Sequence, residues 1–306
     1  MTAEDKLKEY VEQNEKTAKT FSQVNTANES LKKGKVFNNN ISDILGYQEI
    51  PLKDLPTQGL FYPTDARILI RAATAGEIRH WSTMNESNIS DVYDHLNYIM
   101  EKCVYFKLEN GLGNWTMIKE MDRMYLLFAV RDFTFTEGNN ELKMKISENN
   151  EIAIHKDNVK FIDFPEKIMK YYSSSERCFV FKFKTGNELR MYIPSIGVSS
   201  WLKKYLISKE ESKEGYDKDF IQLAPMLIPD DYKLSNRSYE EFIINNYPKY
   251  GINEYSLISQ VYDMLLESSV PKIIYKDEAG ADQTAPLTFP GFKSIFTVPD
   301  VFEGLL

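Results

Sequence analysis

LPTQGLFYPTDARILIR, residues 55–71, is the stretch of this 306-residue chain that says most about its fold. Pro56 fixes one φ angle, and Gly59 readily adopts the positive φ values that side chains disfavour, so the first half predicts a tight turn. Phe61 and Tyr62 then place two aromatic rings next to each other in the sequence. We expect this segment to pack against the body of the protein and to present a shaped surface.

A strand and a helix are predicted directly after this turn. The apolar residues between Arg67 and Arg71 indicate a short strand. Thr74 and Glu77 then form the Thr-x-x-Glu pattern of a capping box, in which each residue satisfies a backbone N–H of the other. The helix that this box opens is predicted over residues 74–84.

A second informative block, DRMYLLFAVRDFTF at residues 122–135, overlaps a helix predicted over roughly 116–131. The apolar residues of this helix are spread around its axis and not confined to one face, which indicates burial on two sides. Arg123 and Arg131 lie two turns apart on roughly the same side, and a buried guanidinium needs carboxylate or carbonyl partners. Two interpretations stay open: a polar contact that sets the register between modules or subunits, or an internal ion pair such as Arg123 with Glu120.

Both blocks resemble segments of the baseplate hub protein family of T-even-type contractile-tailed phages. The first is similar to that family's LPSxGxFYP segment, which a strand ending in Arg and a Thr-x-x-Glu helix follow. The second is similar to its DRxYLLFxIRxxTF segment, and a weaker third likeness is IPSIG at residues 193–197. The likeness extends over residues 48–205, and Thr57 stands where the family more often has Ser.

The resemblance implies a structural virion protein of the tail baseplate, made in the host cytoplasm. Its implied partners are other phage baseplate and tail proteins, joined in several symmetry-related copies. Because aromatic and arginine side chains are enriched at protein contacts, we expect the following residues to contact other subunits: Leu7, Tyr10, Val11, Phe21, Phe61, Tyr62, Arg71, Arg123, Arg131, Phe289, Phe292, Phe296 and Phe302. A transient chaperone for hub assembly is the alternative function, and an enzyme with a hidden carboxylate site is a third hypothesis.

Composition argues against several other classes of protein. Acidic residues outnumber basic ones by 45 to 37, and a surface with a net charge of −8 repels phosphate backbones. Two cysteines, Cys103 and Cys178, are too few for a disulfide framework or a zinc site. No apolar run approaches the ~20 residues that span a bilayer. We therefore expect no nucleic acid, membrane, metal, cofactor or small-molecule substrate as a partner.

Sequence motifs for catalysis are incomplete. The three histidines His80, His95 and His155 lack the spacing of metal ligands, and Gly111-Leu-Gly113 lacks the third glycine of a dinucleotide fingerprint. There is no Walker pattern, and Ser199-Ser200-Trp201 lacks the glycines of a nucleophile elbow. We therefore expect the protein not to be an enzyme.

The pattern along the chain predicts an α+β protein, with a mainly helical body, a small antiparallel sheet and extended N- and C-terminal arms. We expect five segments: an N-terminal helical docking arm at 1–45, an α+β core module at 46–140, an antiparallel β module at 141–195, a helical module at 196–270, and a hairpin with an extended C-terminal tail at 271–306. A self-packed helix is the alternative for the first segment. The Phe-rich tail is expected to lie across a partner or back onto its own domain.

Hydrophobic periodicity predicts further elements in these segments. A helix over roughly 88–105 has an apolar face that begins at Ile89. The remaining expected helices are 196–208, 217–223, 238–246 and 253–267; the expected strands are 151–154, 159–164, 178–183 and 189–193; a hairpin is expected between 271–276 and 285–289, and a charged loop at 208–219.

Overall fold

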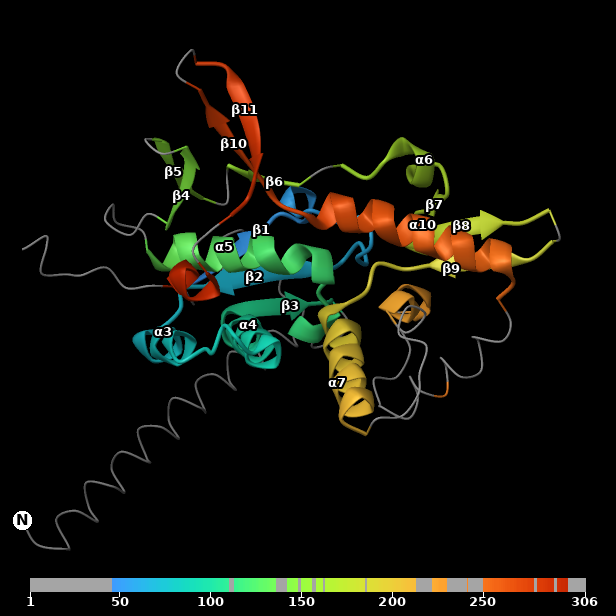
Figure 1. The fold of residues 1–306 in the computed structure, drawn as a ribbon, viewed down its shortest axis with the longest axis horizontal. Coiled ribbons are helices and arrows are strands. Elements are labelled where there is room, and N and C mark those ends of the chain that lie inside the picture. Colours follow the sequence, from blue (N-terminus) through green and yellow to red (C-terminus); the bar gives the residue numbers. More distant parts are fainter. Residues whose placement is uncertain are drawn as a thin grey trace, which may run out of the picture. The chain divides into compact units, whose positions relative to one another are not determined.

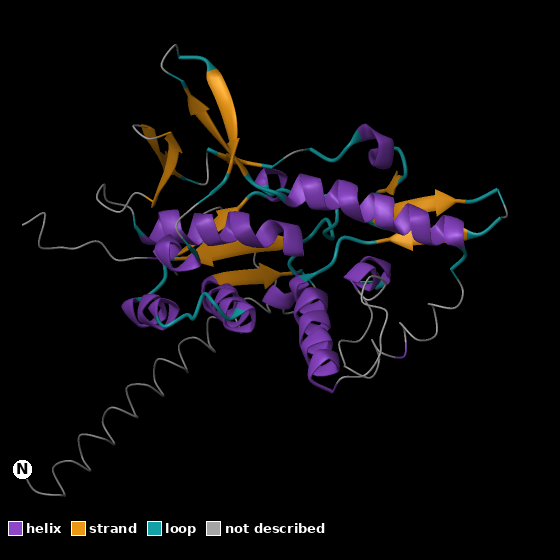
Figure 2. Cartoon of the chain, viewed as in Figure 1, coloured by secondary structure: helices purple, strands orange, loops and turns teal. Residues whose placement is uncertain are grey.

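A computed structural model describes most of the chain between residues 46 and 296. The described residues are 46–109, 113–135, 142–147, 150–155, 158–161, 163–184, 186–212, 222–229, 241, 250–277, 280–288 and 291–296. All of them belong to the second of the two compact units into which the chain divides, Gly46–Leu306. Helices and small antiparallel sheets are mixed along this unit (Figures 1 and 2), which confirms the predicted α+β class. The predicted arm at 1–45 and the end of the tail lie outside the described residues.

The first sheet contains the strand that the opening motif predicted. Its order is β1-β2-β3, with antiparallel neighbours. The bounds are β1 (Tyr47–Ile50), β2 (Arg67–Arg71) and β3 (Val104–Lys107). Ile68 lies opposite Ile50 on one side and Phe106 on the other, and all three side chains are buried. One face of the sheet therefore belongs to the hydrophobic core.

Helices α3 (Ala75–Ser82) and α4 (Ile89–Cys103) connect β2 to β3. Thr74 and Glu77 form the predicted capping box at the start of α3. Asn88 caps α4 by accepting from the backbone N–H groups of the first turn. The apolar face of α4 is buried as expected, except that Ile89 is 60% exposed. The prediction for Ile89 was wrong because it is the first residue of the helix, ahead of the turns that pack on the sheet.

The helix predicted over 116–131 is divided into three pieces. They are the 3-10 turns η2 (Trp115–Met117) and η3 (Glu120–Asp122) and the α-helix α5 (Arg123–Thr134). Asn114 caps η2 rather than a long helix. The backbone between the pieces pairs elsewhere, since the N–H of Glu120 donates to the carbonyl of Pro194 and the N–H of Ile196 donates to the carbonyl of Ile118. A continuous helix would need those same groups for its own i to i−4 hydrogen bonds.

The predicted single sheet within 141–195 is three separate sheets. They comprise the pair β4 (Leu142–Ser147) and β5 (Asn150–Ile154), the sheet β11-β10-β6 and the sheet β7-β8-β9. The remaining bounds are β6 (Val159–Lys160), β7 (Tyr172–Ser173), β8 (Cys178–Lys182), β9 (Glu188–Met191), β10 (Lys272–Lys276) and β11 (Asp282–Pro286). The expected strand 159–164 is short because β6 pairs with β10, and the turn of helix α6 (Glu166–Met169) follows at Pro165. The predicted hairpin after residue 271 is confirmed.

The later helices are α7 (Ile196–Ser212), the 3-10 turn η4 (Ala224–Leu227), α10 (Ile252–Ser269) and the 3-10 turn η6 (Phe292–Phe296). The helices expected at 196–208 and 253–267 are therefore present. The charged loop expected from residue 208 was placed too early, because α7 continues to Ser212. Most of the helices expected at 217–223 and 238–246 lies outside the described residues.

Buried apolar side chains form two clusters. The first cluster lies around β1-β2-β3, α4 and α5, and includes Ile154, Ile273 and Phe296 from later parts of the chain. The second cluster lies around β8, β9, α7, η4 and α10, and includes Phe61 from the opening motif. These clusters group the elements differently from the predicted modules, since β4, β5, β10 and η6 pack with the first sheet and β8 and β9 pack with the later helices.

Candidate functional site

The turn at residues 55–63 has the conformation that its sequence predicts. The N–H of Gln58 donates to the carbonyl of Leu55 at 2.8 Å, and the N–H of Leu60 donates to that of Thr57 at 3.1 Å. Gly59 has φ of +74°, and a Cβ atom added there would lie 2.8 Å from the Cβ of Leu52. Both the backbone angle and the space therefore require glycine at this position.

The two neighbouring aromatic residues of the turn belong to different clusters. The Phe61 ring is fully buried in the second cluster, with centroids 5.4 Å from Tyr172 and 5.4 Å from Phe179. The Tyr62 ring belongs to the first cluster, 5.8 Å from Phe106. The turn thus ties the two clusters together through consecutive residues.

The buried side chain of Asp122 fixes this turn through hydrogen bonds. Its side chain is fully buried, and its carboxylate accepts hydrogen bonds from the N–H of Thr57 (2.9 Å), the hydroxyl of Thr57 (2.8 Å) and the hydroxyl of Tyr62 (2.6 Å). The Tyr62 hydroxyl in turn accepts from the N–H of Lys119 at 2.8 Å. The first two sequence blocks are therefore bound to each other by a buried carboxylate.

Burial dominates the electrostatics of Asp122. It raises the pKa of this carboxyl from 3.8 to about 6, although the donors on Tyr62 and Thr57 and the charge of Lys119 act in the opposite direction. Three hydrogen bonds stabilise the ionised form but do not fully replace the water that burial removes. The carboxylate therefore fixes the turn at an electrostatic cost.

The third sequence block, at residues 193–197, meets the other two at the same place. Lys119 and Ser195 form an isolated antiparallel bridge, flanked by the hydrogen bonds of Glu120 with Pro194 and of Ile118 with Ile196. We call this meeting point the joint; its residues are Thr57, Phe61, Tyr62, Lys119, Asp122 and Pro194–Ile196. Backbone pairing and the buried hydrogen bonds of Asp122 therefore hold the three sequence blocks together at the joint.

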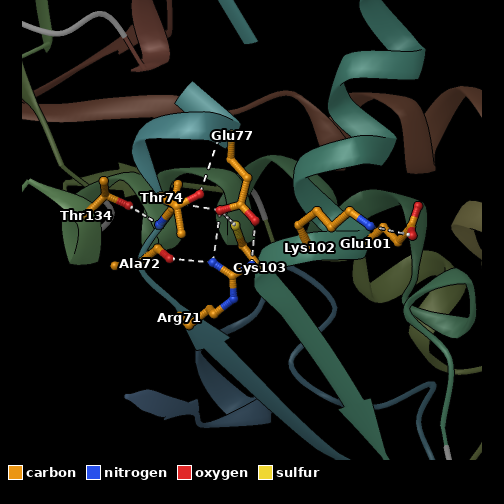
Figure 3. A network of polar contacts seen from close by, with 9 residues as sticks. Arg71, Ala72, Thr74, Glu77, Glu101, Lys102, Cys103 and Thr134 are labelled. Carbon is orange, nitrogen blue, oxygen red and sulfur yellow. Dashed lines mark hydrogen bonds and ion pairs between the residues drawn. The ribbon is translucent and has the colours of Figure 1, made fainter. Parts of the chain in front are cut away.

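Arg71, a predicted contact residue, lies in a separate polar network next to Ala73 and Cys103 of the first cluster (Figure 3). Its guanidinium donates to both carboxylate oxygens of Glu77, at 2.9 and 2.5 Å, and to the carbonyl of Ala72 at 2.8 Å. Glu77 also accepts from the N–H of Thr74 (2.7 Å) and from the thiol of Cys103 (3.7 Å). This network joins the end of β2 to the start of α3.

Charges and burial set the protonation states of this network. The hydrogen bond from Arg71 outweighs burial and lowers the pKa of Glu77 to about 2. Burial is the main cause that raises the pKa of the Cys103 thiol to about 12. Because a thiol with that pKa is protonated at neutral pH, Cys103 lacks the thiolate that a nucleophile requires.

The other two predicted arginines are almost fully buried. Arg123 is 2% exposed, and its Nη2 donates to Glu120 at 2.7 Å, which is the internal ion pair that the sequence predicted as one alternative. Arg131 forms an ion pair with Asp132 at 3.4 Å and lies over the ring of Phe135. In this conformation neither side chain offers much surface to another subunit, and their role in subunit contacts stays a prediction.

The structure describes some of the C-terminal aromatic residues and not others. Phe296 is buried at 5.1 Å from the ring of Trp81, and the indole N–H of Trp81 donates to the carbonyl of Phe292 at 3.0 Å. Residues 291–296 therefore lie back on their own domain, one of the two predicted alternatives. The following predicted contact residues lie outside the described part of the chain: Leu7, Tyr10, Val11, Phe21, Phe289 and Phe302.

The joint was only partly visible in the sequence. Phe61 and Tyr62 were predicted as contacts with other subunits, which stays a prediction; in the described chain both are buried, and neither they nor Thr57 and Asp122 were predicted to meet in an internal joint. The available signal was an acidic residue immediately before a strongly apolar helix, where burial of its charge demands donors from elsewhere.

Over the described residues there is no group of three or more His, Cys, Asp or Glu side chains arranged to hold a metal ion. Within the same residues, no helix has both the length and the apolar character needed to cross a membrane. No protein-family model, curated protein or solved structure matches the chain.

Proposed function

We propose that the chain is a structural component of a contractile-tailed phage baseplate, in the hub or at the wedge periphery. In this function it joins neighbouring tail subunits through its body and its extended arms. The proposal rests on the likeness of three sequence blocks to the baseplate hub family. The observation that carries it is that these blocks, far apart in sequence, meet at the joint: the buried carboxylate of Asp122 binds the first two blocks, and backbone pairing of Lys119 with Ser195 adds the third.

This observation favours a structural role for the resembling residues. The blocks supply aromatic rings, hydroxyls and backbone groups that fix the relation between two clusters. A scaffold needs this property, because contacts between subunits are specific only when the surfaces that form them keep their shape. A typical stable contact of this kind buries about 1,600 Å² in total.

The arms are proposed to supply part of that contact. Residues 1–45 carry a thin apolar stripe that includes Leu7, Tyr10, Val11 and Phe21. Ordering such an arm costs conformational entropy, which binding must recover. Hydrogen exchange of the isolated full-length chain tests this point: the proposal expects residues 1–40 to exchange quickly alone and slowly in the assembled particle. Strong protection in the isolated chain would contradict a docking arm.

Mass spectrometry of purified mature particles tests the main proposal. A structural component is expected in every particle at a fixed ratio to the other tail proteins. If the chain is absent from mature particles but co-purifies with hub subunits from assembly intermediates, the transient chaperone is the better function. Normal tails assembled in cells that lack the chain would contradict both.

A further inference from the structure

A cluster of charged side chains from α4, η3, the first residue of α5 and α7 lies outside the joint. The guanidinium carbon of Arg123 is 5.3 Å from the centroid of the Tyr93 ring, and the ammonium of Lys203 is 3.0 Å from the same centroid. Arg123 donates to Glu120 at 2.7 Å, and Lys203 donates to the carbonyl of Ile89 at 3.1 Å. We call Tyr93, Glu120, Arg123 and Lys203 the cation cluster.

Two buried hydrogen-bond donors of the cation cluster lack an acceptor among the described residues. Arg123 is 2% exposed, yet its Nε and Nη1 have no hydrogen-bond partner among the residues that the structure describes. Asn97, one turn after Tyr93 on α4, donates to the hydroxyl of Ser200 at 3.2 Å, and its buried Oδ1 accepts from no described residue. Buried N–H groups of a charged guanidinium are rarely left without an acceptor, because their desolvation costs free energy that only a partner offsets.

The cluster also carries more positive than negative charge. Two cations share one carboxylate, that of Glu120, while the nearby Asp94 is exposed to solvent. Burial and the charge of Arg123 lower the pKa of Lys203 to about 8, against the opposite effect of Glu120 and Asp94. One further negative charge placed between Arg123 and Lys203 would relieve this repulsion.

Solvent can reach one side of the cluster. The side chain of Glu120 is 30% exposed, and Lys203 and Tyr93 are half-buried, whereas Arg123 lies at the inner end. A small ligand that arrives beside Glu120 would therefore lie close to the guanidinium of Arg123, which Glu120 contacts at 2.7 Å.

We propose that the cation cluster is a binding site for an oxyanion, a carboxylate or phosphate group that accepts from Arg123 and Lys203. Oxyanions match the observed need, because their several lone pairs can accept from a guanidinium and an ammonium together. The site is independent of the baseplate proposal, since it rests only on the contacts of these side chains.

Nuclear magnetic resonance of the full-length chain, labelled at the lysine ε-carbon, tests the site. The Lys203 signal is assigned from the Lys203→Arg variant and titrated with pH in chloride, acetate or inorganic phosphate at equal ionic strength. Binding stabilises the charged ammonium, so the Lys203 midpoint should rise above its value in chloride. Identical Lys203 midpoints in all three salts would overturn the proposal.

The two anions also identify the source of the ligand. A rise in phosphate alone assigns the site to phosphate groups, a rise in acetate alone assigns it to carboxylates, and a rise in both supports a general oxyanion site. The apparent anion affinity, measured by the rise in thermal stability with anion concentration, should be about tenfold weaker in the Lys203→Met variant, the loss expected for one charge-assisted contact. Lys102→Met is the matched control, because Lys102 lies over the Tyr98 ring of the same helix without a neighbouring guanidinium contact to that ring. Equal affinity in the Lys203→Met and Lys102→Met variants would contradict the assignment.

Discussion

Phe61 and Tyr62 are consecutive residues whose rings are buried in two different hydrophobic clusters. Such a pair couples the clusters, because neither ring can leave its site without moving the backbone that positions the other. The buried carboxylate of Asp122 strengthens this coupling by holding the Tyr62 hydroxyl and the backbone of Thr57. A few residues therefore fix how the two clusters are coupled, and single substitutions can test this coupling.

Replacing Phe61 with alanine should destabilise the second cluster most directly. Truncation of a fully buried Phe costs about 3–5 kcal/mol in unfolding free energy. Hydrogen exchange resolved by peptide should show the largest loss of protection in β8 and α10, which contribute to that cluster. The matched control is Tyr105→Phe, because the Tyr105 ring is exposed. Equal loss of protection in both clusters would indicate that the chain unfolds as one unit.

Asp122 should make the protein less stable as pH rises between about 4 and 6. Its pKa is 3.8 in the reference state and about 6 when folded, so within this range the folded state binds the proton more tightly than the unfolded state. Stability from this group is thus greatest at low pH and is lost as pH rises through the folded pKa. The difference corresponds to about 3 kcal/mol.

Urea unfolding of the wild-type chain and of Asp122→Asn across this range measures the effect. Asparagine does not titrate, so the stability of the wild-type chain relative to the variant should decrease from pH 4 to pH 7. Subtracting the variant removes the contributions of other titrating groups. Parallel pH profiles would show that Asp122 keeps its ordinary pKa in the fold.

Local patterns in the sequence predicted the elements whose causes are local. The strand at Arg67–Arg71 follows from the run of apolar residues between its two arginines, and the start of α3 follows from the side chains of Thr74 and Glu77. Positive φ at Gly59 follows from the residue type within its turn. In each case the residues that decide the structure lie within a few positions of one another.

Such local patterns could not predict the elements whose structure depends on distant residues. The expected helix over 116–131 is interrupted because its backbone pairs with residues 194–196, and the expected sheet is divided because β6 pairs with β10. Periodicity cannot reveal a partner more than 70 positions away. For the same reason, the sequence did not predict Asp122 as the centre of the joint, since its hydrogen-bond donors come from residues 57 and 62.

Glu77→Gln should remove a stabilising charge from the network at the start of α3. Loss of the charged hydrogen bonds with Arg71 is expected to cost about 1.5–3 kcal/mol at pH 7. The folded pKa of Glu77 is depressed to about 2, so its contribution is present above about pH 4.5 and is lost as pH falls towards 2. Unfolding of wild type and variant by urea at pH 7 and pH 3 measures both effects.

Glu101→Gln provides the matched control for Glu77→Gln. Glu101 also pairs with a cation, Lys102, at 3.1 Å, but both side chains are exposed (Figure 3). Exposed pairs of this kind contribute about 0–1 kcal/mol. A cost for Glu101→Gln as large as that for Glu77→Gln would mean that burial of the Arg71 network adds nothing to its strength.

Gly59→Ala should destabilise the joint through two separable effects. The first is the positive φ angle, which costs an alanine about 1 kcal/mol. The second is contact, because the new Cβ would lie 2.8 Å from the Cβ of Leu52 and the turn would have to shift. Gly46→Ala isolates the first effect, since Gly46 has φ of +66° and no described residue lies within 4 Å of an added Cβ. The excess cost of Gly59→Ala over Gly46→Ala, measured by thermal unfolding, therefore reports how rigidly the joint holds its turn, and equal costs would mean that the turn adjusts freely.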